Sequence, residues 1–362
     1  MTDDRGPIEV AWFGALCDDD YEFLGVPEPE RQSSWDHCSD IVQAADEHCF
    51  DNVLLPSGYE LGIDPVAFAA AIATRTRRIN LLVAVRMGEL WLPQLARQLA
   101  TIDHFSHGRL TINIISSDIP GQTLPSEARY RRTSEWMDAL RRLMSGQAVD
   151  MDGEFVSLHV DPPRLLSSAT TCPPFYFGGF SEDAKAVAAQ HADVFLTWPD
   201  TVQGITATVA DMRARATASG RTLECGLRVH VIVRETEKDA REAARRLVSR
   251  LDPVVGEQIR RRSLDSQSIG VQRQTELRDG ADADGFVEEN LWTGIGRARS
   301  GAGAAIVGDP DQVLAKIQAY RRAGIGAFIF SGYPHREEAD LFARYVLPSL
   351  AHSPLRGRLG PG

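Results

Sequence analysis

The chain is poor in the features that stabilise secreted proteins or anchor membrane proteins. It has five cysteines in 362 residues, none of them in a CxxC pair: Cys17, Cys38, Cys49, Cys172 and Cys225. An odd, scattered set of this kind is typical of free thiols in a reducing compartment. No apolar run reaches the ~18 residues that a membrane span needs, and the opening MTDDRGPIEV has no basic segment followed by an apolar one. These absences predict a cytoplasmic protein that does not enter the membrane.

Positive charge is also in short supply. Lysine and arginine total 39 against 50 aspartates and glutamates, so the formal net charge is −11. Nucleic acids and anionic membranes recruit proteins through clustered positive charge, and an acidic chain lacks that attraction. We therefore expect a small-molecule partner rather than a nucleic acid or a membrane.

Several motifs that carry catalysis in other proteins are absent. The sequence has no GxGxxG after its first apolar run, no P-loop and no GxSxG nucleophile elbow. His104 and His107 are spaced as possible metal ligands, but no third ligand accompanies them, so no metal site is expected. Chemistry carried by a bound organic cofactor fits this pattern better than chemistry by a protein nucleophile.

What the chain does contain is a regular alternation of apolar runs and helical patterns. Eight runs are typical of strands, at residues 8–16, 52–58, 78–86, 109–116, 173–179, 192–198, 222–236 and 326–332. Runs that are apolar on both faces and separated by helices predict a parallel sheet. Eight of them predict an α/β TIM barrel, the (β/α)8 fold, with a doubly wound open sheet as the alternative.

We expect a single domain over residues 1–362 with two insertions. The first, at about 115–172, contains a helical pattern followed by a hairpin whose turn is Asp152-Gly153. The second, at about 252–304, is rich in Arg, Gln, Asp and Gly and is predicted to be irregular. A segment of that kind could close over a site and exclude water.

Polar residues gather where the predicted strands end, which is where TIM barrels place their active sites. Arg228 and His230 are two residues apart in the seventh strand and so share one of its faces. The eighth strand ends in FIFSGYPH, which releases Ser331 and Tyr333 at the same rim. Because a buried arginine without an anion is costly, this grouping predicts an anion-binding pocket at the barrel mouth.

The segment FGGFSEDA follows the fifth strand. Gly178 and Gly179 would let the backbone approach a ligand closely, and Ser181 precedes a predicted helix whose first N–H groups are free. A phosphate-bearing cofactor suits such a turn, and an ordinary capped helix after a strand would give the same pattern.

Six stretches together resemble the reduced-FMN-dependent alkanesulfonate monooxygenases of the bacterial-luciferase-like superfamily: ARQLATIDHFSHGR (96–109), PPFYFGG (173–179), FLTW (195–198), LRVHVIVRET (227–236), NLWTGIG…GAGAAIVGDP (290–310) and SGYPHREEA (331–339). The resemblance covers residues from about 9 to 350 and implies the same barrel. It also implies a two-component enzyme, in which a separate NAD(P)H:flavin reductase supplies reduced FMN and O2 is the co-substrate. The peroxyflavin formed from them would cleave the C–S bond of a small sulfonate anion to give an aldehyde and sulfite.

The resemblance also assigns residues, position by position. The candidate catalytic residues, around the sulfonate and the peroxyflavin, are Trp198, Arg228, His230, Arg299 and Tyr333. The candidate cofactor-binding residues are Asn113, Tyr130, Gly179 and Ser181, to which the strand ends add Gly178 and Ser331. We also expect a homodimer or a homotetramer.

Departures from the family pattern leave the substrate open. The cysteine that the family carries after its second strand is missing from PSGYELGIDP (56–65), and RMGELWLP (86–93) places the large Trp91 beside the expected pocket. A tailoring monooxygenase of specialised metabolism, acting by hydroxylation or Baeyer–Villiger oxidation, is therefore the alternative. An inactive flavin-binding barrel and a deazaflavin-dependent reductase are further alternatives.

Overall fold

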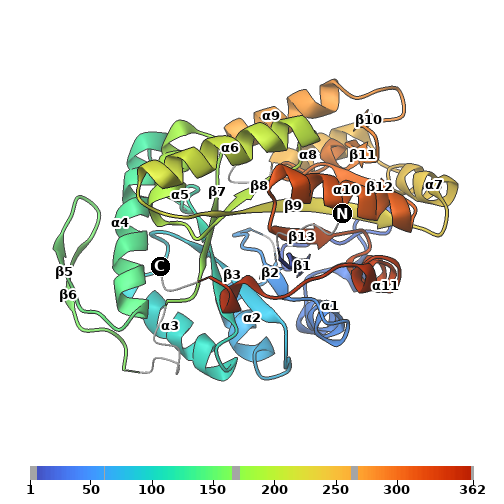
Figure 1. The fold of residues 1–362 in the computed structure, drawn as a ribbon. Coiled ribbons are helices and arrows are strands. Elements are labelled where there is room, and N and C mark those ends of the chain that lie inside the picture. Colours follow the sequence, from blue (N-terminus) through green and yellow to red (C-terminus); the bar gives the residue numbers. More distant parts are fainter. Residues whose placement is uncertain (1–5, 61, 165–171, 262–267, 360–362) are drawn as a thin grey trace.

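Eight parallel strands close into a barrel in the computed structural model, which describes residues 6–60, 62–164, 172–261 and 268–359 (Figure 1). The strands are β1 (Glu9–Phe13), β2 (Asn52–Leu55), β3 (Asn80–Arg86), β4 (Leu110–Ile115), β7 (Phe175–Gly178), β8 (Val194–Thr197), β9 (Glu224–Val233) and β13 (Ala327–Ser331). Each pairs with the next in this order, and β13 pairs with β1, which completes the ring. The predicted TIM barrel is confirmed, and every strand is shorter than its apolar run.

Helices cover the outside of the barrel (Figure 1). They are α1 (Trp35–Glu47), α2 (Pro65–Ile72), α3 (Leu92–Phe105), α4 (Ser126–Met144), α5 (Glu182–His191), α6 (Val202–Ala218), α10 (Pro310–Ala323) and α11 (His335–Tyr345). Several begin at a polar cap: the side chains of Ser34, Asp64, Thr201 and Asp309 each accept a hydrogen bond from the first helical turn. Each cap fixes the residue at which the loop ends and the helix begins.

A buried polar layer closes the end of the barrel where the strands begin. Tyr176 Oη donates to Glu9 Oε1 at 2.7 Å, and Asn52 Nδ2 donates to Thr111 Oγ1 at 3.1 Å. The second carboxylate oxygen of Glu9 accepts from the backbone N–H of Leu355, 2.8 Å away, so the C-terminal segment crosses this end. Burial raises the pKa of Glu9. An apolar layer of inward-facing side chains separates these groups from the opposite end: Ala11, Leu54, Leu82, Val194, Ala327 and Ile329.

The long strand β9 belongs to two parts of the sheet. Its residues up to His230 pair with β13, and its residues from His230 onward pair with β12 (Ala305–Gly308). β12 in turn pairs with β11 (Leu291–Trp292), and β11 with β10 (Phe286–Glu288). Three further strands therefore extend the sheet beyond the barrel at His230.

The second predicted insertion was wrongly expected to be irregular. Its described residues include α8 (Pro253–Arg261), α9 (Ile269–Asp279) and the strand pair β10–β11; α7 (Glu237–Leu247) precedes it. Strands of two and three residues are too short to show a period-two pattern, and a polar helix such as α9 shows little apolar periodicity. The sequence signal was therefore weak for physical reasons.

The first insertion contains the predicted hairpin, β5 (Val149–Asp152) and β6 (Ser157–Val160), which stands away from the barrel beside α4 (Figure 1). The carboxylate of Glu135 in α4 accepts from the backbone N–H groups of Glu154, Phe155 and Val156 and so holds the turn. None of the helices in the described part of the chain combines the length and hydrophobicity needed to cross a bilayer.

Candidate active site

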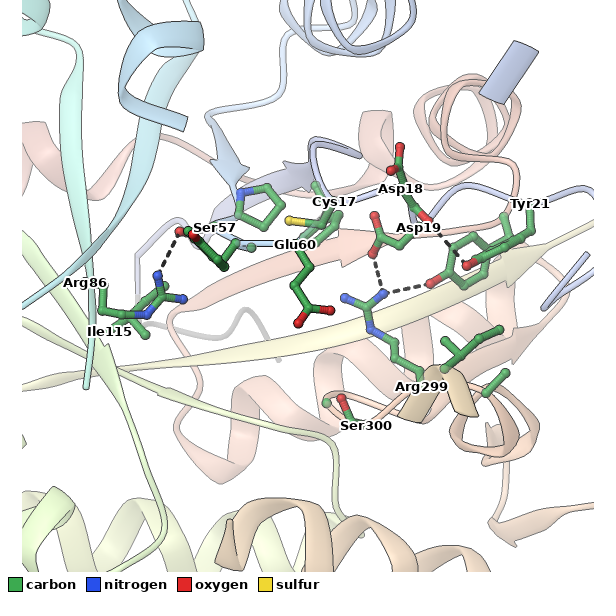
Figure 2. A pocket seen from close by; sticks show the side chains of 18 residues that line it. Cys17, Asp18, Asp19, Tyr21, Ser57, Glu60, Arg86, Ile115, Arg299 and Ser300 are labelled. Carbon is green, nitrogen blue, oxygen red and sulfur yellow. Dashed lines mark hydrogen bonds and ion pairs between the residues drawn. The ribbon is translucent and has the colours of Figure 1, made fainter. Parts of the chain in front are cut away.

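A pocket of about 300 Å³ opens where the barrel strands end (Figure 2). Its walls come from the loop after β1, the loop after β2, the ends of β3 and β4, and the segment that precedes β12. Among the candidate site residues, Arg299 and Tyr333 line it directly. Arg228 and His230 are also buried, with exposed fractions of 5% and 0%, but they are not among the residues that line it.

The ring of Phe13, the last residue of β1, is the centre of this arrangement. The guanidinium carbon of Arg228 lies 4.3 Å from the ring centroid, and that of Arg299 lies 5.3 Å from it. The imidazole of His335 stacks on Phe13 with centroids 5.5 Å apart. Two guanidinium groups thus meet at one aromatic ring, whose face attracts cations but does not neutralise them.

Arg228 is a buried cation without a carboxylate partner among the described residues. Its Nη1 donates only to the backbone carbonyl of Val229, at 3.3 Å, and its Nη2 has no hydrogen-bond partner in the described part of the chain. Burial, followed by the nearby charge of Arg299, lowers the pKa of Arg228 to about 9. A bound anion would relieve both effects.

Arg299 is held from two sides. Its Nη1 donates to Tyr333 Oη at 2.8 Å and forms an ion pair with Asp19, which Figure 2 shows. Burial alone would lower the pKa of Arg299, but Tyr333 and Asp19 outweigh burial, and the net shift is upward. Burial also raises the pKa of Tyr333, so the phenol keeps its proton at neutral pH. Because Tyr333 Oη accepts from Arg299, that proton is directed toward another acceptor.

His230 occupies the position where β9 changes partner. Its Nδ1 hydrogen-bonds to Ser331 Oγ at 2.7 Å, and its ring lies against that of Tyr333. Burial, reinforced by the charge of Arg228, lowers the pKa of His230 well below its usual value. His230 therefore contributes a neutral hydrogen-bonding ring at neutral pH rather than a positive charge.

His335 is a buried polar residue to which the sequence assigned no role. It is fully buried, and neither of its ring nitrogens has a hydrogen-bond partner in the described part of the chain. Its ring meets that of Tyr333 edge-on at 5.1 Å, and its backbone N–H donates to Asp20 Oδ1 at 2.9 Å. Burial lowers its pKa. Its place two residues after Tyr333, in the same strand-end stretch, was the available signal.

Four of the six candidate cofactor-binding residues gather on a neighbouring part of the rim: Tyr130, Gly178, Gly179 and Ser181. Ser331 lies instead beside His230. Ser181 caps α5, and its Oγ accepts from the backbone N–H of Ala184 at 3.2 Å. A Cβ atom added to Gly179 would lie 2.4 Å from Ala184 Cβ and 3.5 Å from Tyr130 Oη, so Tyr130, Gly179 and α5 are brought together. A Cβ on Gly178 would lie 2.5 Å from the carbonyl oxygen of Leu196, so glycine is required there by the packing of β8.

This part of the rim fits a phosphate-bearing flavin. The guanidinium carbon of Arg129 lies 5.6 Å from the centroid of the Tyr130 ring. Its Nη1 forms an ion pair with Asp118 at 3.2 Å, and its Nε is buried without a hydrogen-bond partner among the described residues. The Nε of Arg129 and the free N–H groups at the start of α5, on either side of Tyr130, are donors that suit the phosphate of FMN.

Trp198 and Asn113 occupy two further positions. The Trp198 ring packs 5.8 Å from that of Phe180, and a Cβ on Gly301 would lie 3.6 Å from Trp198, so Trp198 lies between the glycine turn and the Arg299 segment. Asn113 shares a strand face with Ile115, which lines the pocket, and so points into the barrel interior below it.

Sequence reasoning missed the acidic side of the pocket and misplaced one aromatic residue. Asp18 and Asp19 come from CDDDY, soon after β1, and Glu60 comes from the loop after β2. The rule applied to the other strands, that polar residues after a strand end face the mouth, would have found all three. Trp91, expected beside the pocket, is instead 62% exposed and is not among the residues that line it.

Comparisons with known proteins give a consistent result. The family model described as luciferase-like monooxygenase matches residues 23–327. The chain is 61% identical to a sulfoquinovose monooxygenase of Novosphingobium aromaticivorans, over 96% of this chain and 98% of the relative. It is 48% identical to a sulfoquinovose monooxygenase of Agrobacterium fabrum, over 96% of this chain and 91% of the relative.

Among solved structures, the EDTA monooxygenase EmoA from Chelativorans sp. BNC1 superposes with a TM-score of 0.77 over 98% of each chain, at 17% identity, which is a likeness of fold. The family match, the two relatives and the closed barrel agree with the resemblance that the sequence motifs suggested. The chain therefore belongs to the luciferase-like monooxygenase family and is a flavin-dependent monooxygenase.

Proposed function

We propose that this monooxygenase cleaves the C–S bond of a sulfosugar related to sulfoquinovose, rather than that of an alkanesulfonate as the motifs first suggested. The observation that carries the proposal is Arg228, a buried guanidinium without a carboxylate partner among the described residues, beside a second guanidinium on the Phe13 ring. The names of the two curated relatives support the sulfosugar.

A sulfonate is the kind of anion that this arrangement would stabilise. It is fully ionised at neutral pH, and its three oxygens accept from several donors at once. Arg228 Nη2 and Arg299 Nε are both buried and without hydrogen-bond partners in the described part of the chain. Leaving such charged donors unpaired is costly, and a bound anion removes the cost.

The chemistry would come from reduced FMN, which supplies electrons to O2 when it is bound. Tyr130, Gly179, Ser181 and Arg129 are the residues suited to hold it, with Trp198 between that site and Arg299. A separate reductase that delivers reduced FMN, and a homodimeric or homotetrameric assembly, are parts of the same proposal.

The overall reaction balances with these reactants. A substrate R–CH2–SO3⁻ with O2 and FMNH2 gives R–CHO, HSO3⁻, H2O and FMN, so one oxygen atom ends in the carbonyl and the other in water. The protein's own groups bind and orient: Arg228 and Arg299 hold the sulfonate, and Tyr333 Oη and the neutral His230 offer a proton and an acceptor beside it.

The test is sulfite release. The protein is mixed with anaerobically reduced FMN, oxygen and one of two substrates, sulfoquinovose or octanesulfonate. We expect sulfite from sulfoquinovose, little from octanesulfonate, and at least a hundredfold loss in the variant Arg228→Met. A matched control is Arg97→Met, in α3 and outside the pocket. Oxygenated product without sulfite would favour the tailoring reaction instead, and no sulfite from either substrate would overturn the proposal.

A further inference from the structure

The two ends of the pocket differ in chemistry. One end holds Arg299 and Asp19, and the other holds Arg86 and Ser57, with Glu60 between them (Figure 2). The first end, with Arg228 beneath it, is the candidate sulfonate site. The second end has no assigned role, and it is built from the loop after β2 and the last residue of β3.

Arg86 is anchored but retains a free donor. Its side chain is 3% exposed, its Nε donates to Ser117 Oγ at 2.7 Å, and its Nη1 donates to Glu89 at 3.1 Å and to Ser57 at 3.5 Å. No described residue accepts a hydrogen bond from Nη2, although Arg86 lines the pocket. Although the Arg86 side chain is almost wholly buried, Nη2 has no partner among the described residues, and Arg86 borders the cavity, so a ligand acceptor in the cavity would complete its hydrogen bonds.

Glu60 supplies the opposite kind of group. Its side chain extends into the pocket in Figure 2, and it forms no hydrogen bond or ion pair with any described residue. An unpaired carboxylate near an anion site would repel a second negative charge. It is, however, a strong acceptor for hydroxyl groups, and Arg86 Nη2 and Ser57 Oγ are donors on the same wall.

An alkyl chain would fit this wall poorly. Placing methylene groups against Arg86, Ser57 and Glu60 would strip water from all three without replacing its hydrogen bonds. A sugar ring offers both donors and acceptors to these groups. Sites built to hydrogen-bond a hydroxyl reject analogues that lack it by about 10⁴–10⁵-fold in favourable cases.

We propose, on the basis of the function proposed above, that Glu60, Arg86 and Ser57 form a hydroxyl-recognition wall that selects a polyhydroxylated sulfonate. The sulfonate lies toward Arg228 and Arg299, and the ring hydroxyls face this wall. Glu60 accepts from hydroxyls, and Arg86 Nη2 and Ser57 Oγ donate to them.

The experiment compares two ligands that differ in their hydroxyl groups. Sulfoquinovose and cyclohexylmethanesulfonate both carry a sulfonate on a six-membered ring, and only the first has hydroxyls. Calorimetric titration gives the dissociation constant of each for the wild type, Glu60→Leu, Glu60→Gln and Ser57→Ala. The control is Glu30→Leu, because Glu30 is also exposed and lies outside the pocket.

We expect Glu60→Leu to weaken sulfoquinovose binding 10- to 100-fold and to leave cyclohexylmethanesulfonate binding equal or tighter. Ser57→Ala should weaken sulfoquinovose binding less than Glu60→Leu does. The dissociation constant of Glu60→Gln for sulfoquinovose should lie between those of the wild type and Glu60→Leu, and Glu30→Leu should change neither dissociation constant. Equal loss for both ligands, or no loss for sulfoquinovose, would refute the wall. Sulfite assays on the wild type separately test the proposed function. Sulfite release without selective binding would refute the wall alone, and selective binding without sulfite release would refute the proposed function alone.

Discussion

The imidazole of His230 and the phenol of Tyr333 lie nearly parallel, with centroids 5.2 Å apart and planes at 28°. His230 lies within β9, and Tyr333 is the second residue after β13. Each also has a hydrogen-bond partner: Ser331 for His230 and Arg299 for Tyr333. A neutral ring and a protonated phenol are thereby fixed next to two guanidinium groups.

The Tyr333 hydroxyl can be removed without disturbing this stacking. The variant Tyr333→Phe keeps the ring but loses the group that Arg299 Nη1 contacts and the proton it carries. We expect kcat to fall about 100-fold, as for loss of a general acid, with a change of less than tenfold in sulfosugar affinity. Steady-state sulfite kinetics and calorimetry measure the two quantities. Tyr345→Phe, at a surface tyrosine bonded to Glu235, is the control. Unchanged kcat would exclude Tyr333 from proton transfer.

The affinity for sulfonate should fall as the pH rises above about 9. In the free protein Arg228 has a pKa of about 9, lowered by burial and by Arg299, and only its protonated form attracts the anion. Bound sulfonate raises that pKa, so binding takes up a proton above pH 9 and affinity falls up to tenfold per pH unit there. Below pH 9 this dependence disappears. Calorimetry from pH 7 to 10.5 checks it, and Arg228→Met should bind weakly without the alkaline decline.

The cofactor side of the rim should respond to a single methyl group. In Gly179→Ala the new Cβ would lie 2.4 Å from Ala184 Cβ, which forces the start of α5 away from Tyr130. We expect reduced FMN to bind at least tenfold more weakly, as measured by anaerobic fluorescence titration. Gly357→Ala has open space around it and serves as the control. If both variants bind FMN as the wild type does, the flavin phosphate lies elsewhere.

The polar layer at the opposite end of the barrel should affect stability and leave chemistry unaltered. Tyr176→Phe removes the donor to Glu9 and leaves a buried carboxyl group with one partner fewer. We expect the free energy of unfolding to fall by about 1–3 kcal/mol, measured by urea denaturation, with kcat unchanged. A large loss of activity in a fully folded variant would show that this layer is coupled to the pocket.

The sequence could predict those features that leave a pattern among neighbouring residues. The barrel was predictable because strands buried on both faces and separated by helices leave a strong apolar pattern. The pair Arg228 and His230 was predictable because residues two apart in a strand share a face. The short strands β10 and β11 left no such pattern.

The contacts between the site residues could not be predicted from the sequence. Nothing in the sequence distance of 280 residues between Asp19 and Arg299 indicates their ion pair, since it depends on how two loops close over the same rim. Glu60 and His335 were likewise visible only as polar residues after strand ends. Which of them lack a partner is a property of the folded packing.

The partner exchange of β9 at His230 has an evolutionary consequence. The barrel uses the strand only as far as His230, so whatever is attached to residues 230–233 can be rebuilt without altering the eight-stranded ring. That attachment leads directly from Arg299 through β12. Descendants of such a chain could therefore rebuild the segment that carries Arg299 while the rim around Tyr130, Gly179 and Ser181 stays unchanged.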